Sequence, residues 1–336
     1  MILRLVSTPA PFPDILERAR AAAQAGEWAA VRDSLDAWPE ATEHAESCTL
    51  LAEANLRLGL PERARAWLEQ VVPLLELRAD RAPLRRCVNM LGIACTELGD
   101  VDVAERAYLR ALSLAEADSD DLLLARATNN LGVLANLRGD RDLALTNYQL
   151  AIPAYQRLGS SVGIAECYHN MAITFRDIHD LSQAEEYALR AIEFARGAAN
   201  ERLAALATLG RAEIVYRRGD TALAGASARR VADDFARLSD PIREADARRL
   251  SGLALLADGV YPDAEHEIER AVELSHTHGG ALVEAEAMRA LAELHAAVGN
   301  VGEAREAGTK ALGMFERFGA AEDVVAMRDW LDRLPA

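Results

Sequence analysis

A turn signal recurs at a fixed interval along this sequence, and this spacing restricts the fold more than any other feature. The signal, here called a turn mark, is a small or turn-forming residue between two stretches of helical pattern. The marks are Gly26, Gly59, Gly99, Gly139, His179, Gly219, Gly259 and Gly299. From Gly59 onward, each mark follows the previous one by forty positions. A fixed period of this length is typical of proteins in which one supersecondary unit is stacked on the next.

Small residues occupy further positions at fixed distances from the marks. Alanine stands five residues after every mark from Gly59 onward, and glycine or alanine stands seven residues before each of these marks. The position twelve residues after them is alanine or valine in every repeat. Small side chains let two helix backbones approach closely while larger neighbours fill the groove beside them. These columns therefore predict helix–helix contacts.

The segments between marks have the periodicity of helices. Leu122–Arg138 and Leu143–Leu158 carry apolar residues at three- and four-residue spacing. Glycine at a mark can end the first helix in a left-handed conformation. The aspartate that follows it, at Asp100, Asp140 and Asp220, can cap the next helix. No alternation of period two extends far enough to predict a strand, so we expect an all-α chain.

Two repeats carry residues that resemble a known family. The residues are Met90-Leu91-Gly92, Gly99-Asp100, Ala104, Tyr108 and Ala111 in one repeat, and Asn130-Leu131-Gly132, Gly139-Asp140, Ala144, Tyr148 and Ala151 in the next. Their spacing resembles the tetratricopeptide repeat, and the resemblance covers about residues 14–317. The family's usual tryptophan and closing proline are absent, and the period exceeds the family's usual length of about 34 residues. In this respect the chain is similar to the arrays of bacterial signal-responsive regulators and to kinesin-light-chain-like arrays.

The resemblance implies a right-handed superhelical solenoid of about eight helix pairs. We expect one continuous array over residues 1–336, because no linker interrupts it. A final helix at 320–334 should cap the array, since Val324, Met327, Leu331 and Leu334 share one face and the last repeat would otherwise expose an apolar flank.

Charge and hydropathy exclude several classes of partner. The 53 acidic residues outnumber the 37 basic ones, for a net charge of −16, which argues against binding to nucleic acid or to an anionic membrane surface. No apolar run reaches the ~18 residues of a membrane span. The stretch Met1–Val6 contains Arg4 and is too short for a secretory signal. We therefore expect a cytoplasmic protein.

Motifs for catalysis or metal binding are not found. Gly302–Lys310 misses the P-loop spacing by one residue and lies in a helical pattern, and His276-x-His278 is typical of a solvated turn. The cysteines lack metal-ligand spacing and are expected to be buried thiols: Cys48, Cys87, Cys95 and Cys167. We expect no enzymatic activity, no cofactor and no metal.

The resemblance also indicates where a ligand would lie. In this family, ligands contact the first helix of each repeat at positions thirteen, ten, six, three and two residues before the mark. Carried over to this sequence, the candidate groove residues are Arg86, Asn89, Arg126, Asn129, Val133, Asn136, His169, Ile173, Arg176, Leu206, Leu209, Tyr216, Leu253 and Leu256. The eighth repeat places Glu286, Arg289 and Glu293 at the same positions.

Two features of this set suggest a ligand. An Arg-x-x-Asn pair occurs in phase in two successive repeats and could form a polar clamp for a carboxylate or an acidic segment. The leucines and the tyrosine could hold an anchor side chain. Alternatively, the arginines pair with groove carboxylates such as Glu97, Glu166 and Glu213, and the leucines pack between helices. Asn130 and Asn170 could instead satisfy interhelix hydrogen bonds.

The leading hypothesis is a non-enzymatic scaffold or sensor that binds a peptide segment of a protein partner in the groove of the third to seventh repeats. The alternative is a regulatory protein that responds to a small ligand or signal peptide. Such a regulator would act on transcription through a partner, because neither end of the chain contains a basic helix-turn-helix. An open channel would favour the peptide, and a closed pocket the small ligand.

Overall fold

The structure is a computed structural model, and it describes residues 12–38, 44–318 and 320–335. Residues 1–11, which include the stretch Met1–Val6, lie outside the described part. Over the described ranges the chain forms helices and turns and no strand, which confirms the all-α prediction. No helix there is long and apolar enough to cross a membrane. Contacts group the chain into an N-terminal part, residues 1–163, and a C-terminal part, residues 164–336.

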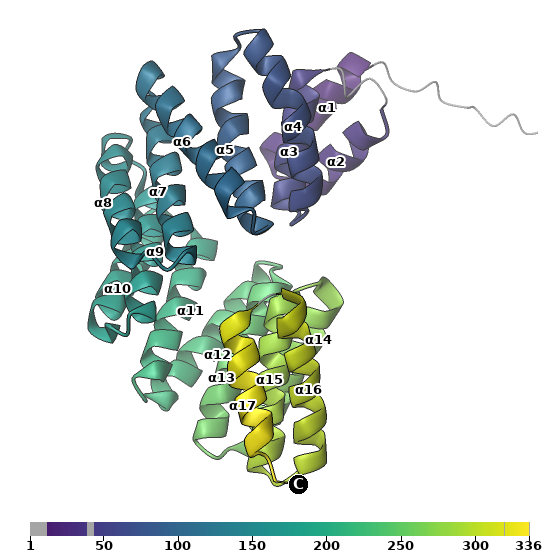
Figure 1. Cartoon of the computed structure of the whole chain (residues 1–336), viewed down its shortest axis with the longest axis vertical. Coiled ribbons are helices and arrows are strands. Elements are labelled where there is room, and N and C mark those ends of the chain that lie inside the picture. The colour runs from purple at the N-terminus through teal and green to yellow at the C-terminus, as the bar shows by residue number, and fades with distance from the viewer. Residues whose placement is uncertain (1–11, 39–43, 319, 336) are drawn as a thin grey trace, which may run out of the picture. The chain divides into compact units, whose positions relative to one another are not determined.

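The helices follow one another as antiparallel pairs, with a last helix after the eighth pair (Figure 1). The N-terminal part contains α1 (Phe12–Ala25) and α2 (Trp28–Asp36), α3 (Ala45–Arg57) and α4 (Pro61–Leu77), α5 (Arg81–Glu97) and α6 (Val101–Asp118), and α7 (Asp121–Leu137) and α8 (Arg141–Arg157). The helix α9 (Ser161–Asp177) begins at the boundary. The C-terminal part continues with α10 (Leu181–Gly197), α11 (Glu201–Arg217) and α12 (Thr221–Arg237), α13 (Pro241–Ala257) and α14 (Tyr261–His278), α15 (Ala281–Ala297) and α16 (Val301–Phe318), and α17 (Ala321–Arg333).

Every turn mark ends the first helix of its pair in a left-handed conformation. All seven glycine marks have positive φ, and His179 has φ 62°. At Gly139, the amide of the glycine donates to Asn136 O at 3.0 Å and the amide of Asp140 donates to Ala135 O at 2.9 Å, which is a Schellman motif. The Asp140 side chain then accepts from the Leu143 amide at 3.1 Å and caps α8. Asp220 caps α12 in the same way, whereas Asp100 makes no side-chain cap.

A second series of left-handed turns, not predicted from the sequence, ends the second helix of six pairs, from α4 to α14. The residues lie twenty positions after the marks: Ala79, Ser119, Gly159, Ala199, Ser239 and Gly279. Only two of the six residues are glycine, so the spacing of glycines in the sequence does not predict these turns. Most helices between Arg81 and Ala297 have 17 residues. A three-residue connection then places the start of each next helix twenty positions after the last, and two such steps give the period of forty.

The small residues seven positions before each mark lie at the contact inside a helix pair. A Cβ added to Gly132 would stand 2.5 Å from Cε1 of Tyr148, a side chain that is 1% exposed. Gly92 faces Tyr108 and Gly252 faces Ile268 in the same way. At these three positions the absence of a glycine side chain therefore leaves room for the ring or the branched side chain of the second helix.

The last helix covers the flank of the last repeat, and Figure 1 shows it beside α15 and α16. Met327 is buried, and Val324 and Leu331 pack against the cluster that contains Phe315. These contacts confirm the capping helix, although it ends at Arg333 and Leu334 is already extended.

Candidate functional site

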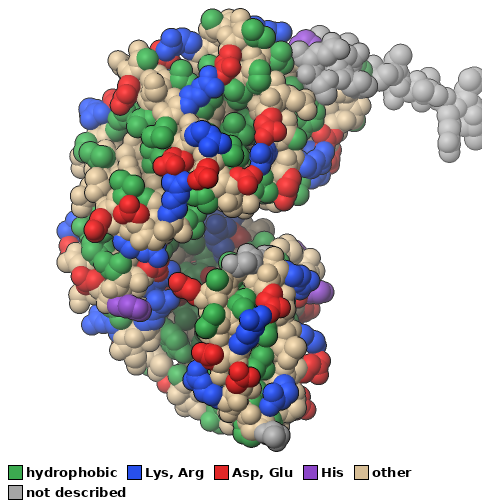
Figure 2. All heavy atoms as spheres, viewed as in Figure 1, with side chains coloured by type: hydrophobic (Ala, Val, Ile, Leu, Met, Phe, Trp, Pro, Cys, Tyr) green, Lys and Arg blue, Asp and Glu red, His purple; other side chains and the backbone are tan. Residues whose placement is uncertain are grey.

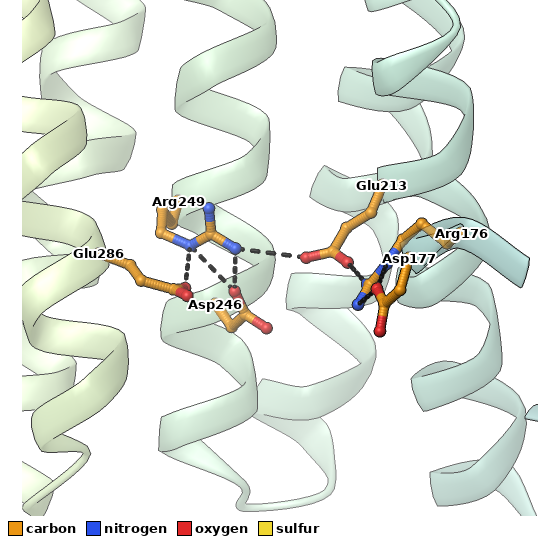
Figure 3. A network of polar contacts seen from close by, with 6 residues as sticks. All are labelled: Arg176, Asp177, Glu213, Asp246, Arg249 and Glu286. Carbon is orange, nitrogen blue, oxygen red and sulfur yellow. Dashed lines mark hydrogen bonds and ion pairs between the residues drawn. The ribbon is translucent and has the colours of Figure 1, made fainter. Parts of the chain in front are cut away.

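The first helices of the C-terminal part carry a chain of charged side chains that runs across successive repeats (Figure 3). Arg176 at the end of α9 forms an ion pair with Glu213 of α11. Glu213 also accepts from Arg249 of α13, with Oε1 3.3 Å from Nη2. Arg249 contacts two further carboxylates, Asp246 at 2.6 Å and Glu286 of α15 at 3.2 Å. Four consecutive repeats are thus joined through two arginines.

Arg249 is the centre of this network. Its side chain is only 9% exposed. Burial by itself would lower the pKa of a guanidinium, but the carboxylates of Asp246, Glu286 and Glu213 outweigh burial, and the pKa of Arg249 is raised. The network of Figure 3 also includes Asp177, which pairs with Arg176 at 3.1 Å. Two arginines therefore face four carboxylates, and the network as a whole carries excess negative charge.

A pocket of about 950 Å³ adjoins the network. One wall consists of groove positions on α11, α13 and α15, including Tyr216, Leu253 and Glu293. The other wall is α17, which contributes Val325 and Trp330. The last helix therefore has two roles, because one of its faces caps the array and another lines a cavity.

The acidic side chains of this pocket differ in their surroundings. Burial raises the pKa of Glu286 and of Glu293, and nearby arginines only partly offset this rise. Glu286 is held by Arg249, whereas Glu293 forms no ion pair with any residue that the structure describes. Arg289, which also lines the pocket, is paired with Asp323 of α17 at 2.7 Å.

The groove residues predicted in the C-terminal part are divided between the pocket and the helix contacts. Tyr216 and Leu253 line the pocket, and Arg176 belongs to the network. Leu209 is 3% exposed, and it packs within a core cluster against which Leu206 is also packed. For Leu209 the structure therefore favours the packing alternative over contact with a ligand.

The remaining predicted residues of this part are half-buried. Leu256 packs against the cluster that contains Ile268, and Ile173 is half-buried on α9. His169 packs against Gly210 of α11, the next first helix. A Cβ added to Gly210 would lie 3.4 Å from Cε1 of His169. Burial, together with the charges of Arg176 and Arg243, lowers the pKa of His169 to about 4.

The predicted polar clamp lies in the N-terminal part, and its four residues do not share one role. Arg86 forms an ion pair with Glu53. Asn89 and Asn129 are each 7% exposed, and the Asn89 side chain accepts from Asn130 Nδ2 at 3.3 Å. The two asparagines are therefore enclosed between helices. Arg126 is exposed and has no ion pair among the described residues.

Two more predicted residues of the N-terminal part, Val133 and Asn136, are half-buried on α7.

The carboxylate that neutralises Arg86 is Glu53 of the preceding repeat, which stands six residues before the mark Gly59. The equivalent residue for Arg126 is Ile93, which explains why only one of the two arginines is paired. The difference between Glu53 and Ile93 could have been found in the sequence by comparing the position six residues before each mark in successive repeats.

Other sites for chemistry are not apparent in the described ranges. No group of three or more His, Cys, Asp or Glu side chains there could hold a metal ion. The four cysteines are free and buried, as predicted, and burial raises the pKa of the Cys167 thiol to about 12. Thiols in this state are poor nucleophiles at neutral pH. Acidic and basic side chains are interspersed over the face seen in Figure 2.

Comparisons with known proteins agree with the repeat architecture. Two family models described as tetratricopeptide repeat match residues 123–197 and 86–118. Residues 86–118 and 123–197 therefore consist of tetratricopeptide repeats, and helix pairs of the same architecture continue through Phe318. A search of curated proteins gives no match. The tetratricopeptide repeats seen here are longer than usual, as the period of forty requires.

Solved structures with the same fold include three of interest. BtubC from P. vanneervenii has 23% identity and a TM-score of 0.56, over 66% of this chain and 92% of that one. The Rap protein complexed with Competence and Sporulation Factor has 12% identity and a TM-score of 0.63, over 95% and 96%. A signal transduction ATPase with a tetratricopeptide repeat sensor, from Pyrococcus horikoshii, has 14% identity and a TM-score of 0.63, over 96% and 52%. At these low sequence identities the similarity shows a shared fold only.

Proposed function

We propose that this protein is a non-enzymatic interaction scaffold or sensor that binds a segment of a protein partner along its first helices. The observation that carries the proposal is the pocket between Leu253 and α17, beside the network of Arg249. It combines half-buried charges with apolar and aromatic side chains on the surface where tetratricopeptide repeats take their ligands. Structures similar in fold include the Rap protein complexed with Competence and Sporulation Factor and an ATPase with a tetratricopeptide repeat sensor, and both support this class of function.

The first helices of the C-terminal part are suited to a polypeptide because several successive repeats present contacts. The network already joins four repeats, so the groove side chains are held in place before a partner arrives. Binding then orders fewer side chains, which reduces the entropy lost on association. A partner segment would find a fixed polar surface with Tyr216 and Leu253 as apolar contacts.

The predicted acidic partner segment is favoured only in the N-terminal part. There Arg126 is exposed and unpaired among the described residues, and it could bind a carboxylate. The enclosed Asn89 and Asn129 would not take part without a change in helix packing. The groove of the C-terminal part has an excess of carboxylates and does not favour an acidic segment.

A site-specific cross-link tests the proposed surface. A photoreactive amino acid replaces Leu253 in one variant and Leu223 in a control variant, where Leu223 is an exposed residue on the second helix α12. Both proteins are irradiated in an extract of the source cells, and cross-linked peptides are identified by mass spectrometry. We expect one partner segment to be recovered from position 253 and not from position 223. Equal recovery at both positions, or no polypeptide at position 253, would contradict the proposal.

The second candidate is a regulator that responds to a small ligand or signal peptide and acts on transcription through a partner. It is favoured by the volume of the pocket, about 950 Å³, because small-molecule sites span roughly 300–1,000 Å³. A non-polypeptide adduct at position 253 in the same experiment would support this candidate.

A further inference from the structure

The pocket beneath α17 has a charge imbalance that the protein itself does not correct. Three of its carboxylates form no ion pair with described residues: Glu293 on α15, and Glu322 and Asp329 on α17. They come from both walls, so a group inside the pocket would be flanked by negative charge on two sides. Of these, Glu293 is the most enclosed, and burial raises its pKa.

Two of the three arginines that line the pocket are already paired with other carboxylates and do not offset this charge. Arg249 already has three carboxylates within 3.3 Å, and Arg289 is paired with Asp323. Only Arg333, exposed near the end of α17, lacks an ion pair among the described residues. An anionic ligand inside the pocket would meet Arg249 and Arg289, which are already neutralised, and would be repelled by Glu293. A cationic ligand would meet unpaired carboxylates.

Aromatic and apolar side chains lie between the charges. Tyr216 and Trp330 line the pocket from opposite walls, and Leu253 and Val325 add apolar surface. Val325 is 59% exposed, which is unusual for a large apolar side chain on a capping helix. A cation above a tryptophan or tyrosine ring is attracted by the ring quadrupole, most strongly when water is excluded. A guanidinium or ammonium on an apolar stem matches this lining.

We propose that the pocket formed by α11, α13, α15 and α17 binds a guanidinium or ammonium group, supplied by an arginine or lysine side chain of the partner segment. The carboxylate of Glu293 pairs with the cation, Trp330 and Tyr216 contact its charged head, and Leu253 and Val325 contact its stem. This inference rests on the proposed function, since it names the chemistry of the segment bound at the same surface. It also reverses the expected charge of the partner for this part of the chain.

The binding test uses two ligands of matched shape. Acetyl-arginine amide carries a guanidinium, and acetyl-citrulline amide replaces it with a neutral urea of nearly the same size. Each is titrated into the full chain, with saturation-transfer NMR as the readout. We expect the arginine ligand to bind roughly tenfold more tightly, and its affinity to fall as salt is added. Equal affinities of the two ligands, or no binding of the arginine ligand, would overturn the proposal.

Three variants locate the site. Glu293→Gln and Asp329→Asn each remove one unpaired carboxylate of the pocket, and Asp329 is exposed, so its replacement leaves the packing intact. Asp332→Asn removes the same charge from α17 at a position that does not line the pocket. We expect the first two changes to weaken the arginine ligand by roughly three- to tenfold and the third to leave it unchanged. An equal loss in all three variants would reduce the effect to overall charge and would overturn the site.

A third arm separates the source of the cation from the proposed function. Propylguanidine has the guanidinium and an apolar stem, without the peptide groups and with the same single charge. Comparable or weaker binding of propylguanidine supports a side chain of a polypeptide, whereas much tighter binding of propylguanidine overturns the polypeptide source. If cross-linking at position 253 finds a partner segment whose binding ignores Glu293→Gln, the function stands and this inference fails. If the arginine ligand requires Glu293 but no partner segment is found, the proposed function fails and the cation site stands.

Discussion

Replacing Arg249 by methionine tests whether the charge network is held away from water. Methionine keeps the apolar stem and removes the guanidinium, which contacts Asp246 at 2.6 Å, Glu286 at 3.2 Å and Glu213 at 3.3 Å. Glu213 retains Arg176, but Asp246 and Glu286 lose the guanidinium that pairs with them. Breaking a buried ion pair from one side typically costs about 3–5 kcal/mol, and we expect a loss of this size in the free energy of unfolding.

The same change at an exposed pair is the control. Arg270 pairs with Glu273 on α14, with side-chain exposures of 42% and 66%. Such pairs contribute about 0–1 kcal/mol, so Arg270→Met should leave stability nearly unchanged. Both variants are measured by denaturant unfolding followed by circular dichroism at 222 nm. Equal midpoints for Arg249→Met and Arg270→Met would refute the claim that the network is desolvated.

The pH dependence of Arg249→Met gives a second readout. Burial already raises the pKa of Glu286, and without the guanidinium its folded-state pKa should rise further above the unfolded value. The folded variant then binds more protons than the unfolded chain, and its stability falls as pH rises from the unfolded pKa through the folded pKa. We therefore expect the loss to be small near pH 4.5 and full at pH 7–8. A loss that does not change with pH would show that the Glu286 carboxylate remains solvated.

Three further predictions concern packing, backbone and a buried imidazole. Gly132→Ala should lower the free energy of unfolding by ~1–3 kcal/mol, because the added methyl group meets the ring of Tyr148. Gly313→Ala, in open space on α16, should raise it by up to ~1 kcal/mol. Chemical denaturation compares the midpoints of the two variants. Ala199→Gly should raise the melting temperature slightly, because φ is 52° and alanine is strained there; a lower melting temperature would contradict this. His169 should remain neutral in the folded chain down to about pH 4, whereas it is protonated below about pH 6.5 in the unfolded chain. Its contribution to stability, roughly 3 kcal/mol at most, is therefore complete above pH 6.5 and is lost as the pH falls from 6.5 to 4. NMR titration of the imidazole checks this, and titration near pH 6.5 would contradict it.

The sequence was sufficient for the repeat architecture because that architecture depends on backbone turns and on small residues at fixed spacing. Each mark, including His179, lies in a left-handed turn as predicted. The second series of turns was not predicted because alanine and serine occupy four of its six positions, as at Ala199. There the fixed helix length, and not a glycine, sets the turn.

The candidate site was less accessible from sequence because the role of a groove side chain depends on its neighbour one repeat away. Arg86 and Arg126 occupy equivalent positions, but one faces Glu53 and the other the region of Ile93. Burial of Asn89 results from the packing of adjacent first helices, which position counting alone does not give. The pocket was missed because the final helix was predicted only as a cap, although Trp330 lines the cavity.

The claim that the first helices form the binding surface is tested most directly by hydrogen exchange of the full chain with and without the partner segment found by cross-linking. Binding stabilises the helices that it contacts against local opening and slows exchange of their amides. We predict slower exchange in α11, α13, α15 and α17, with the largest effect in the turn of α15 around Glu293. Protection confined to the second helices α12, α14 and α16, with no change in α13 and α15, would contradict the account.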